Sequence, residues 1–95
     1  MPKFVAMCTD KPDSSAVRTA ARSEHLAYIE GARDRILVVG PLLTEEDQVA
    51  GSLYLVEADD LAAAKAFVEN DPFAKAGLFG SIAVKRFRTH LGTLL

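Results

Sequence analysis

Residues 36–43 read ILVVGPLL, an apolar run without a charged side chain. Such a short run of branched residues, with no polar alternation, predicts a β-strand that is buried on both faces. Pro41 has no backbone N–H to donate, so this strand lies at an edge of its sheet or bulges near Gly40 and Pro41. A polar segment at 44–48 leads to a second apolar run at 51–57, and together they predict an antiparallel hairpin.

A strand and a long helix are predicted ahead of the hairpin. Residues 3–9 are mostly apolar and end at the turn-forming segment 10–13. Residues 14–35 contain no proline and are rich in alanine and arginine, which favours a helix. Asp13 or Ser14 can cap the start of this helix.

Another helix and strand are predicted after the hairpin. Asp59 or Asp60 caps a helix that is ended by Pro72, because the proline ring keeps the residue before it out of the helical region. Residues 81–88, which read SIAVKRFR, follow as the last strand. The chain therefore has the element order βαββαβ.

This order predicts a single α+β domain over residues 1–95, with residues 89–95 as a C-terminal tail. With right-handed crossovers it gives a ferredoxin-like sandwich with the strand order 4-1-3-2 and both helices on one face of the sheet. The first three strands are apolar at almost every position, so the face without helices would be a large exposed apolar patch. We therefore expect a homodimer formed through this open face, with the terminal leucines of the tail docked on the partner.

The composition excludes several classes of partner. The chain has 95 residues and a net charge of -2, with acidic and basic residues interspersed, so no basic stripe is available for nucleic acid or for an anionic membrane. The N-terminus lacks the core of a signal peptide and no apolar run reaches the length of a membrane span, which predicts a cytoplasmic protein. Cys8 is the only cysteine, and its place in an apolar strand favours core packing over reactivity.

His25 and Asp71 are the best candidates for chemistry. At about 100° per residue, His25 falls in the apolar sector of the first helix together with Ala21 and Tyr28. A buried imidazole is costly unless a partner bonds it, and a carboxylate held in the turn before Pro72 can do so. A histidine oriented in this way keeps one nitrogen fixed and frees the other to move a proton near neutral pH.

A structural interpretation of the same two residues also stands. His25 is then a core residue bonded to a backbone carbonyl, while Asp71 and Pro72 are the N-cap and the first position of a short helical turn. Spacing alone favours this interpretation, because histidine–aspartate pairs are common and only some of them are catalytic.

Three further residues are candidates for substrate binding. Ser52 can hydrogen-bond a carboxylate or carbonyl of a ligand, or it is merely a small residue at the start of a strand. Arg22 and Arg18 precede His25 by one and two helical turns and can clamp an anion, although such arginines are more often solvated or paired with acidic residues. His90 is expected to be exposed in the tail.

Metal and cofactor sites have no support in the sequence. Two histidines and one cysteine without clustered spacing do not make a zinc site, and the glycines form no phosphate-binding loop. We therefore expect no metal and no cofactor.

Ordered motifs along nearly the whole chain resemble the YciI-like (YCII-related domain) family. They are the segment 22–28 around His25, the Gly40-Pro41-Leu42 and Gly51-Ser52-Leu53 segments, and Asn70-Asp71-Pro72-Phe73 with Ala76-Gly77-Leu78. The resemblance implies the dimeric α+β barrel superfamily, in which two ferredoxin-like subunits pack sheet to sheet. It also implies a histidine–aspartate pair at the active site, which maps to His25 and Asp71.

The resemblance also narrows the expected activity. Relatives include enzymes that act on chlorinated muconolactones, and most family members have no assigned reaction. It implies a small cofactor-independent enzyme of the lyase, isomerase or dehalogenase type that acts on a small carboxylated, muconolactone-like metabolite. The alternative is a non-catalytic module that binds a metabolite or serves only for dimerisation.

Overall fold

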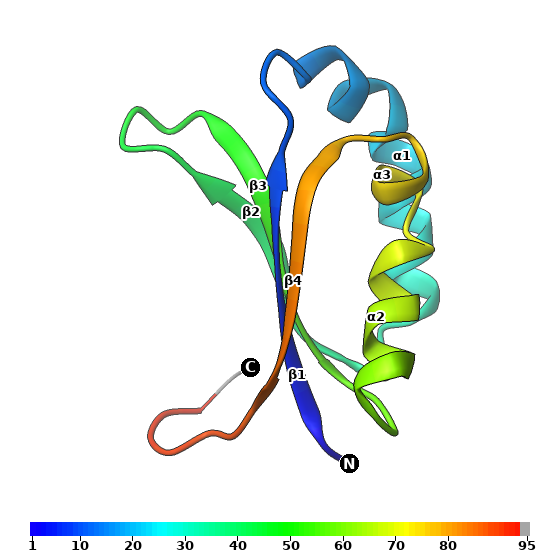
Figure 1. Ribbon diagram of the computed structural model, residues 1–95, viewed down its shortest axis with the longest axis vertical. Helices are drawn as coiled ribbons and strands as arrows, with labels where there is room; N and C mark the ends of the chain where they lie inside the picture. The colour runs from blue at the N-terminus through cyan, green and yellow to red at the C-terminus, as the bar shows by residue number, and fades with distance from the viewer. Residues whose placement is uncertain (94–95) are drawn as a thin grey trace.

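A computed structural model describes residues 1–93, in which four strands form one antiparallel sheet and three helices lie on one side of it (Figure 1). The elements in chain order are β1 (Lys3–Asp10), α1 (Ser15–Gly31), β2 (Ile36–Leu43), β3 (Val49–Glu57), α2 (Leu61–Glu69), α3 (Pro72–Lys75) and β4 (Phe79–Phe87).

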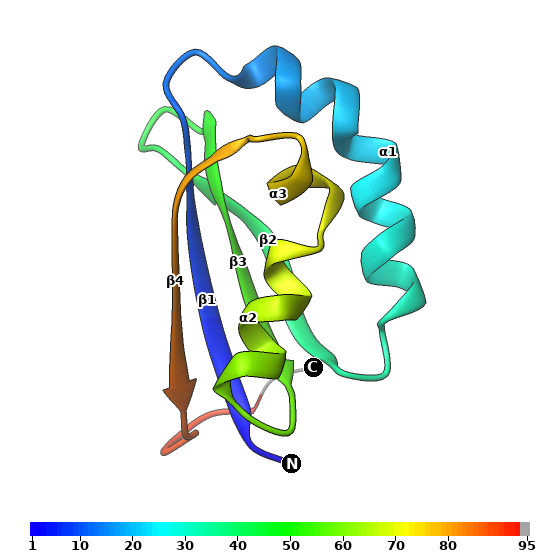
Figure 2. The ribbon, with the colours of Figure 1, turned by 45° about the vertical axis from the view of Figure 1, so that its right-hand side comes forward.

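The strand order is β2-β3-β1-β4, which is the predicted 4-1-3-2 order read from the other edge. β1 pairs antiparallel with both β3 and β4, and β2 pairs antiparallel with β3. Figure 2 shows α1 and α2 side by side on the same face of the sheet, with α3 near the end of α2. The predicted α+β ferredoxin-like fold is confirmed.

Two predicted boundaries differ from the structure at the ends of α1. The helix ends at Gly31 rather than at residue 35, because the carbonyl of Arg35 already accepts a sheet hydrogen bond from the N–H of Glu57. Ser14 occupies the N-cap position, but its hydroxyl donates to the carbonyl of Lys11 and makes no bond to the helix. Asp60, in contrast, caps α2 as predicted by accepting a hydrogen bond from the N–H of Ala63.

The hairpin strand β2 is less buried than its sequence predicts. It is an edge strand, as Pro41 allows, but its residues are half-buried or exposed, and Leu43 has 54% of its surface exposed. The prediction of burial on both faces is therefore wrong for the single chain. An edge strand has only one neighbour, and one face of this sheet carries no helix.

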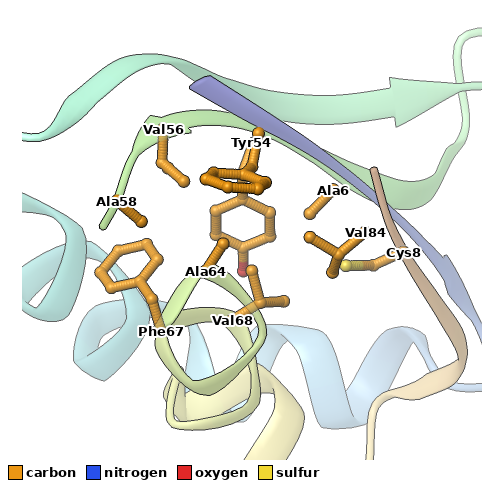
Figure 3. Packing of buried hydrophobic residues seen from close by; sticks show 10 residues of the cluster. Ala6, Cys8, Tyr54, Val56, Ala58, Ala64, Phe67, Val68 and Val84 are labelled. Carbon is orange, nitrogen blue, oxygen red and sulfur yellow. The ribbon is translucent and has the colours of Figure 1, made fainter. Parts of the chain in front are cut away.

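The hydrophobic core lies between the sheet and α2. Buried side chains from alternate strand positions face buried side chains of the helix, and Figure 3 shows Tyr54 in the middle of this cluster. The cluster consists of Phe4, Ala6, Cys8, Tyr54, Val56, Ala58, Ala64, Phe67, Val68 and Val84. The prediction that Cys8 packs in the core is confirmed.

The opposite face of the sheet, here called the open face, is also apolar. Side chains along a strand alternate between the two faces of the sheet. The strand residues that do not face the core are paired with one another across the sheet, so they lie together on this side. Met7 on the central strand is 50% exposed and Phe87 is 39% exposed. The apolar residues of the open face are Val5, Met7, Val38, Leu42, Leu53, Leu55, Ala83 and Phe87.

The part of the predicted tail that the structure describes, residues 89–93, contains no helix or strand and includes the exposed His90. The expected docking of the two terminal leucines concerns Leu94 and Leu95, which lie outside the described residues. Among residues 1–93, no helix has the length and apolar character that would be needed to cross a bilayer.

The environment of Cys8 predicts an unreactive thiol. Burial, followed by the nearby carboxylates of Asp71 and Asp10, raises the pKa of the Cys8 thiol to about 12. Since the thiolate is the nucleophile, the native protein should not react with a disulfide reagent at pH 8, whereas the urea-unfolded chain should react stoichiometrically. Absorbance of the released thiol measures both states. Rapid reaction of native Cys8 would contradict this assignment.

Candidate functional site

His25 lies on the inner face of α1, where it and Ala21 are the two buried residues of the helix. The residue is 7% exposed, and its ring stacks on Phe73 of α3 with a centroid distance of 3.9 Å and an interplanar angle of 14°. On its other side the ring meets Tyr54 edge to face at 6.4 Å. The helical sector predicted for His25 is thus the one that packs against the core.

Asp71 is held by the turn that starts α3. The following Pro72 keeps Asp71 in an extended conformation, with φ -63° and ψ 137°, as an N-cap requires. Its Oδ1 accepts a hydrogen bond of 2.8 Å from the N–H of Phe73. The predicted capping role of Asp71 is therefore confirmed, and it coexists with a second role.

The second role is a buried contact with His25. Nδ1 of His25 lies 2.7 Å from Oδ2 and 2.9 Å from Oδ1 of Asp71, which is completely buried. The hydroxyl of Tyr54 also donates to Oδ2, at 2.7 Å. Donors from α1, β3 and α3 thus surround this carboxylate, the arrangement that stabilises a buried anion.

This contact fixes the roles of the two ring nitrogens of His25. An ionised carboxylate can only accept, so Nδ1 of His25 carries a proton and donates it to Asp71. Nε2 has no hydrogen-bond partner among residues 1–93, although all fully buried side-chain nitrogen and oxygen atoms there have one. Nε2 is therefore the exposed, free nitrogen of the ring.

Arg18 forms a second charged network beside the pair. Its Nε and Nη2 donate to the two carboxylate oxygens of Asp10 at 2.9 and 3.0 Å. Nη2 also donates to the hydroxyl of Ser52 and to the carbonyl of Gly51, both at 2.9 Å. A side chain at position 51 would collide with the carbonyl oxygen of Cys8, so only glycine allows β3 to lie this close to the backbone of Cys8 on β1.

Phe73 links the two charged networks. The guanidinium carbon of Arg18 lies 4.6 Å from the centroid of the Phe73 ring, whose face His25 also covers. Arg18 and His25 are two turns apart on α1, about 10 Å. Phe73 therefore contacts two side chains of the same helix, the imidazole of His25 and the guanidinium group of Arg18.

A cavity of about 290 Å³ opens beside these groups. It brings together His25 and the three residues expected to bind substrate: Arg18, Arg22 and Ser52. Asp71 is completely buried and does not line the cavity, so it can act only through His25. The remaining lining residues are Leu26, Ile29, Val39, Gly40, Pro41, Val49 and Phe73.

The binding candidates differ in their environment. Arg18 is paired with Asp10, as expected if this arginine has a structural role and not a binding role. It also donates a hydrogen bond to the hydroxyl of Ser52. The side chain of Arg22 is exposed and forms no hydrogen bond or ion pair within residues 1–93. Within residues 1–93, no three potential metal ligands lie together.

Sequence analysis missed Tyr54 and Asp10 as members of the site. A tyrosine amid aliphatic strand residues was the available signal, because a buried tyrosine hydroxyl needs a partner. The partner itself could not be identified, since it comes from a turn that is 17 residues away in the sequence.

Comparisons with known proteins agree with this architecture. The family model described as the YCII-related domain matches residues 2–88. Protein YciI from Escherichia coli O6:H1 (strain CFT073) is 31% identical over 93 residues, covering 90% of this chain and 95% of that protein. An uncharacterised protein of Haemophilus influenzae is 30% identical over 93 residues, with the same shares covered.

Two solved structures extend the comparison. The 5-chloro-2-hydroxyhydroquinone dehydrochlorinase TftG from Burkholderia phenoliruptrix AC1100, in complex with 2,5-dihydroxybenzoquinone, is 38% identical with a TM-score of 0.85. The match covers 93% of this chain and 95% of TftG. An antibiotic biosynthesis monooxygenase matches at 15% identity and a TM-score of 0.56 over 96% of this chain and all of that one, which supports the fold alone.

Replacing Asp71 by asparagine tests the pair and the cap together. In Asp71→Asn an NH₂ group replaces one carboxylate oxygen and faces groups that are themselves hydrogen-bond donors. The substitution should therefore lower the free energy of unfolding by about 1–3 kcal/mol. The ring ¹⁵N shifts of neutral His25 should change from a single Nδ1–H tautomer to a mixture. Chemical denaturation and NMR measure the two effects.

Asp60→Asn is the matched control, because Asp60 caps α2 from an exposed position and does not contact His25. It should leave the His25 ring shifts unchanged. Identical ring shifts in Asp71→Asn and the wild type would rule out coupling between His25 and Asp71.

Proposed function

This chain belongs to the YCII-related domain family, and we propose that it is a small enzyme of the lyase, isomerase or dehalogenase type. The observation that carries the proposal is the buried contact of 2.7 Å between His25 and Asp71, beside a cavity lined by His25. His25 acts as the general acid and base through Nε2. Asp71 orients the ring and stabilises the imidazolium that forms when Nε2 takes a proton.

The proposed chemistry begins with a proton transfer from a carbon next to a carbonyl. Nε2 of His25 removes the proton, and the electron pair of the broken C–H bond moves into the carbonyl to give an enolate. In an isomerisation, the imidazolium returns the proton at a different carbon. In an elimination, the electron pair forms a new double bond while an anion such as chloride leaves with its own bonding pair.

The cavity suggests a small, oxygen-rich, anionic substrate. Its volume of about 290 Å³ suits a compound with a single ring, and its apolar walls suit a carbon skeleton. Asp10 neutralises Arg18, so the exposed guanidinium of Arg22 is the group available to a substrate carboxylate or enolate. The 2,5-dihydroxybenzoquinone in the TftG complex supports the same class of ligand.

A non-catalytic module that binds the same kind of metabolite is the alternative, because Arg22, Ser52 and the apolar walls would serve binding equally well. The free Nε2 of His25 favours the enzyme, since binding alone does not require a histidine whose tautomer is fixed by a buried carboxylate.

We also propose that two copies pair through the open face. Half of Met7 is exposed on the central strand of the sheet, and no helix within residues 1–93 covers this side (Figure 1). An apolar face of this extent is unusual for a monomer, and a second copy offers a surface of the same size and character.

His25→Gln separates catalysis from structure. Glutamine retains much of the side-chain volume and an NH₂ group that can donate to Asp71, but it cannot exchange a proton near neutral pH. Turnover should therefore fall by about 10²-fold or more while the melting temperature changes little. His90→Gln is the control, because His90 is exposed and lies outside the cavity. Activity and thermal unfolding should be measured on the same preparation.

The substrate panel should include muconolactone-like acids and chlorinated hydroxyhydroquinones. Undiminished turnover by folded His25→Gln would reject the acid–base role. Wild-type protein that is thermally stabilised by these compounds without forming product would favour the binding module instead.

The dimer proposal predicts the behaviour of a substitution on the open face. The wild-type protein should sediment as a dimer at micromolar concentration, and Met7→Lys should shift it to a monomer, because a lysine at the centre of the interface would be desolvated. Leu61→Lys is the control, since Leu61 is 41% exposed on α2, which packs on the other face of the sheet. A monomeric wild-type protein would refute the proposed assembly.

A further inference from the structure

Tyr54 donates a hydrogen bond to Asp71, and the His25–Asp71 pair alone does not explain the role of Tyr54 in the site. Its side chain is completely buried, and its hydroxyl donates to Oδ2 of Asp71 at 2.7 Å, the same oxygen that lies 2.7 Å from Nδ1 of His25. The other oxygen, Oδ1, accepts from the N–H of Phe73 at 2.8 Å. Each carboxylate oxygen thus has a donor besides His25.

The position of Tyr54 in the sheet explains how its hydroxyl reaches the turn before α3. Tyr54 pairs with Ala6 on β1 and with Val39 on β2, and its ring crosses the core towards the helices, as Figure 3 shows. The small side chains of Ala6 and Ala64 leave space around it. A phenylalanine would fill the same space, so packing alone does not account for the hydroxyl.

We propose that Tyr54 is a positioning residue that acts through Asp71. Its hydroxyl and the N–H of Phe73 hold the carboxylate from two sides, so rotation of the carboxylate would break both hydrogen bonds. The carboxylate therefore stays directed at Nδ1 of His25, which leaves Nε2 free for the proton of the substrate. The catalytic part of this inference rests on the proposed function, whereas the effect on the ring of His25 does not.

The electrostatics keep Tyr54 in the form that donates. Burial, then the negative charge of Asp71 and the hydrogen bond to it, raise the pKa of Tyr54 well above its usual range. The hydroxyl therefore stays protonated throughout the pH range in which an enzyme works. It can therefore donate a hydrogen bond to Asp71 at every stage of a reaction without losing its proton.

Tyr54→Phe removes only the hydroxyl and is the direct test. Loss of a hydrogen bond to a charged group should raise the exchange rate of the Nδ1–H proton of His25 with water by about tenfold. NMR of protein with ¹⁵N-labelled histidine measures this rate without any substrate. Where a substrate is found, kcat should fall by about tenfold with KM unchanged, because Tyr54 does not line the cavity.

Tyr28→Phe is a closely matched control. The hydroxyl of Tyr28 also donates at 2.7 Å, but to the carbonyl of Phe67 and not to Asp71. This variant should lose a tyrosine hydrogen bond of the same length while leaving the Nδ1–H exchange of His25 unchanged. Equal effects of both variants would mean that a general loosening of the core, and not positioning of Asp71, is being measured.

The outcomes separate this inference from the proposed function. If Asp71→Asn alters the His25 signals and Tyr54→Phe does not, the positioning role is rejected and the pair remains. If Tyr54→Phe alters the exchange rate but no compound is turned over, the positioning role stands and the enzymatic proposal fails. Should Tyr54→Phe not fold, the wild-type hydroxyl proton of Tyr54 should exchange slowly, and a rapidly exchanging one would overturn the inference.

Discussion

The buried charge of Asp71 is the constraint on which the rest of the structure depends. An isolated carboxylate inside a protein is destabilising by several kcal/mol, so it persists only where donors surround it. The donors here come from His25 on α1, Tyr54 on β3 and the backbone of Phe73 on α3. The sheet, the long helix and the turn before α3 therefore meet at this one carboxylate.

A second charged network, centred on Arg18, borders the cavity. The guanidinium of Arg18 is held by Asp10 at the end of β1 and by Gly51 and Ser52 on β3, so its charge is balanced and its geometry is fixed. It contributes a rigid wall next to Phe73. The side chain of the neighbouring Arg22 has no ion-pair partner among residues 1–93, so the proposed function assigns ligand binding to Arg22 and a structural role to Arg18.

Much of the fold could be predicted because the relevant information is local. Apolar runs, the prolines at 41 and 72 and the aspartate cap of α2 mark the strands and helices, and the handedness of crossovers then leaves one sheet order. The end of α1 was predicted too late, since it depends on a sheet hydrogen bond between Arg35 and Glu57. The burial of β2 was overestimated because an apolar sequence does not reveal which face of the sheet is packed against helices.

The site could be predicted in part for a related reason. The helical period of α1 directs His25 inward, and Pro72 marks Asp71 as a cap, so each residue could be singled out from its own neighbours. Their contact, the hydroxyl of Tyr54 and the pairing of Arg18 with Asp10 depend on the register of β3 and on how α1 lies against α3. Those distances exist only in the folded chain.

Neutron diffraction from a deuterated crystal at about pH 8 would test the central claim most directly, because it locates the exchangeable hydrogens of the pair. The account predicts a deuteron on Nδ1 of His25, none on Nε2, both oxygens of Asp71 without a deuteron, and the Tyr54 deuteron directed at Oδ2. A deuteron on either oxygen of Asp71, or on Nε2 with a bare Nδ1, would contradict it.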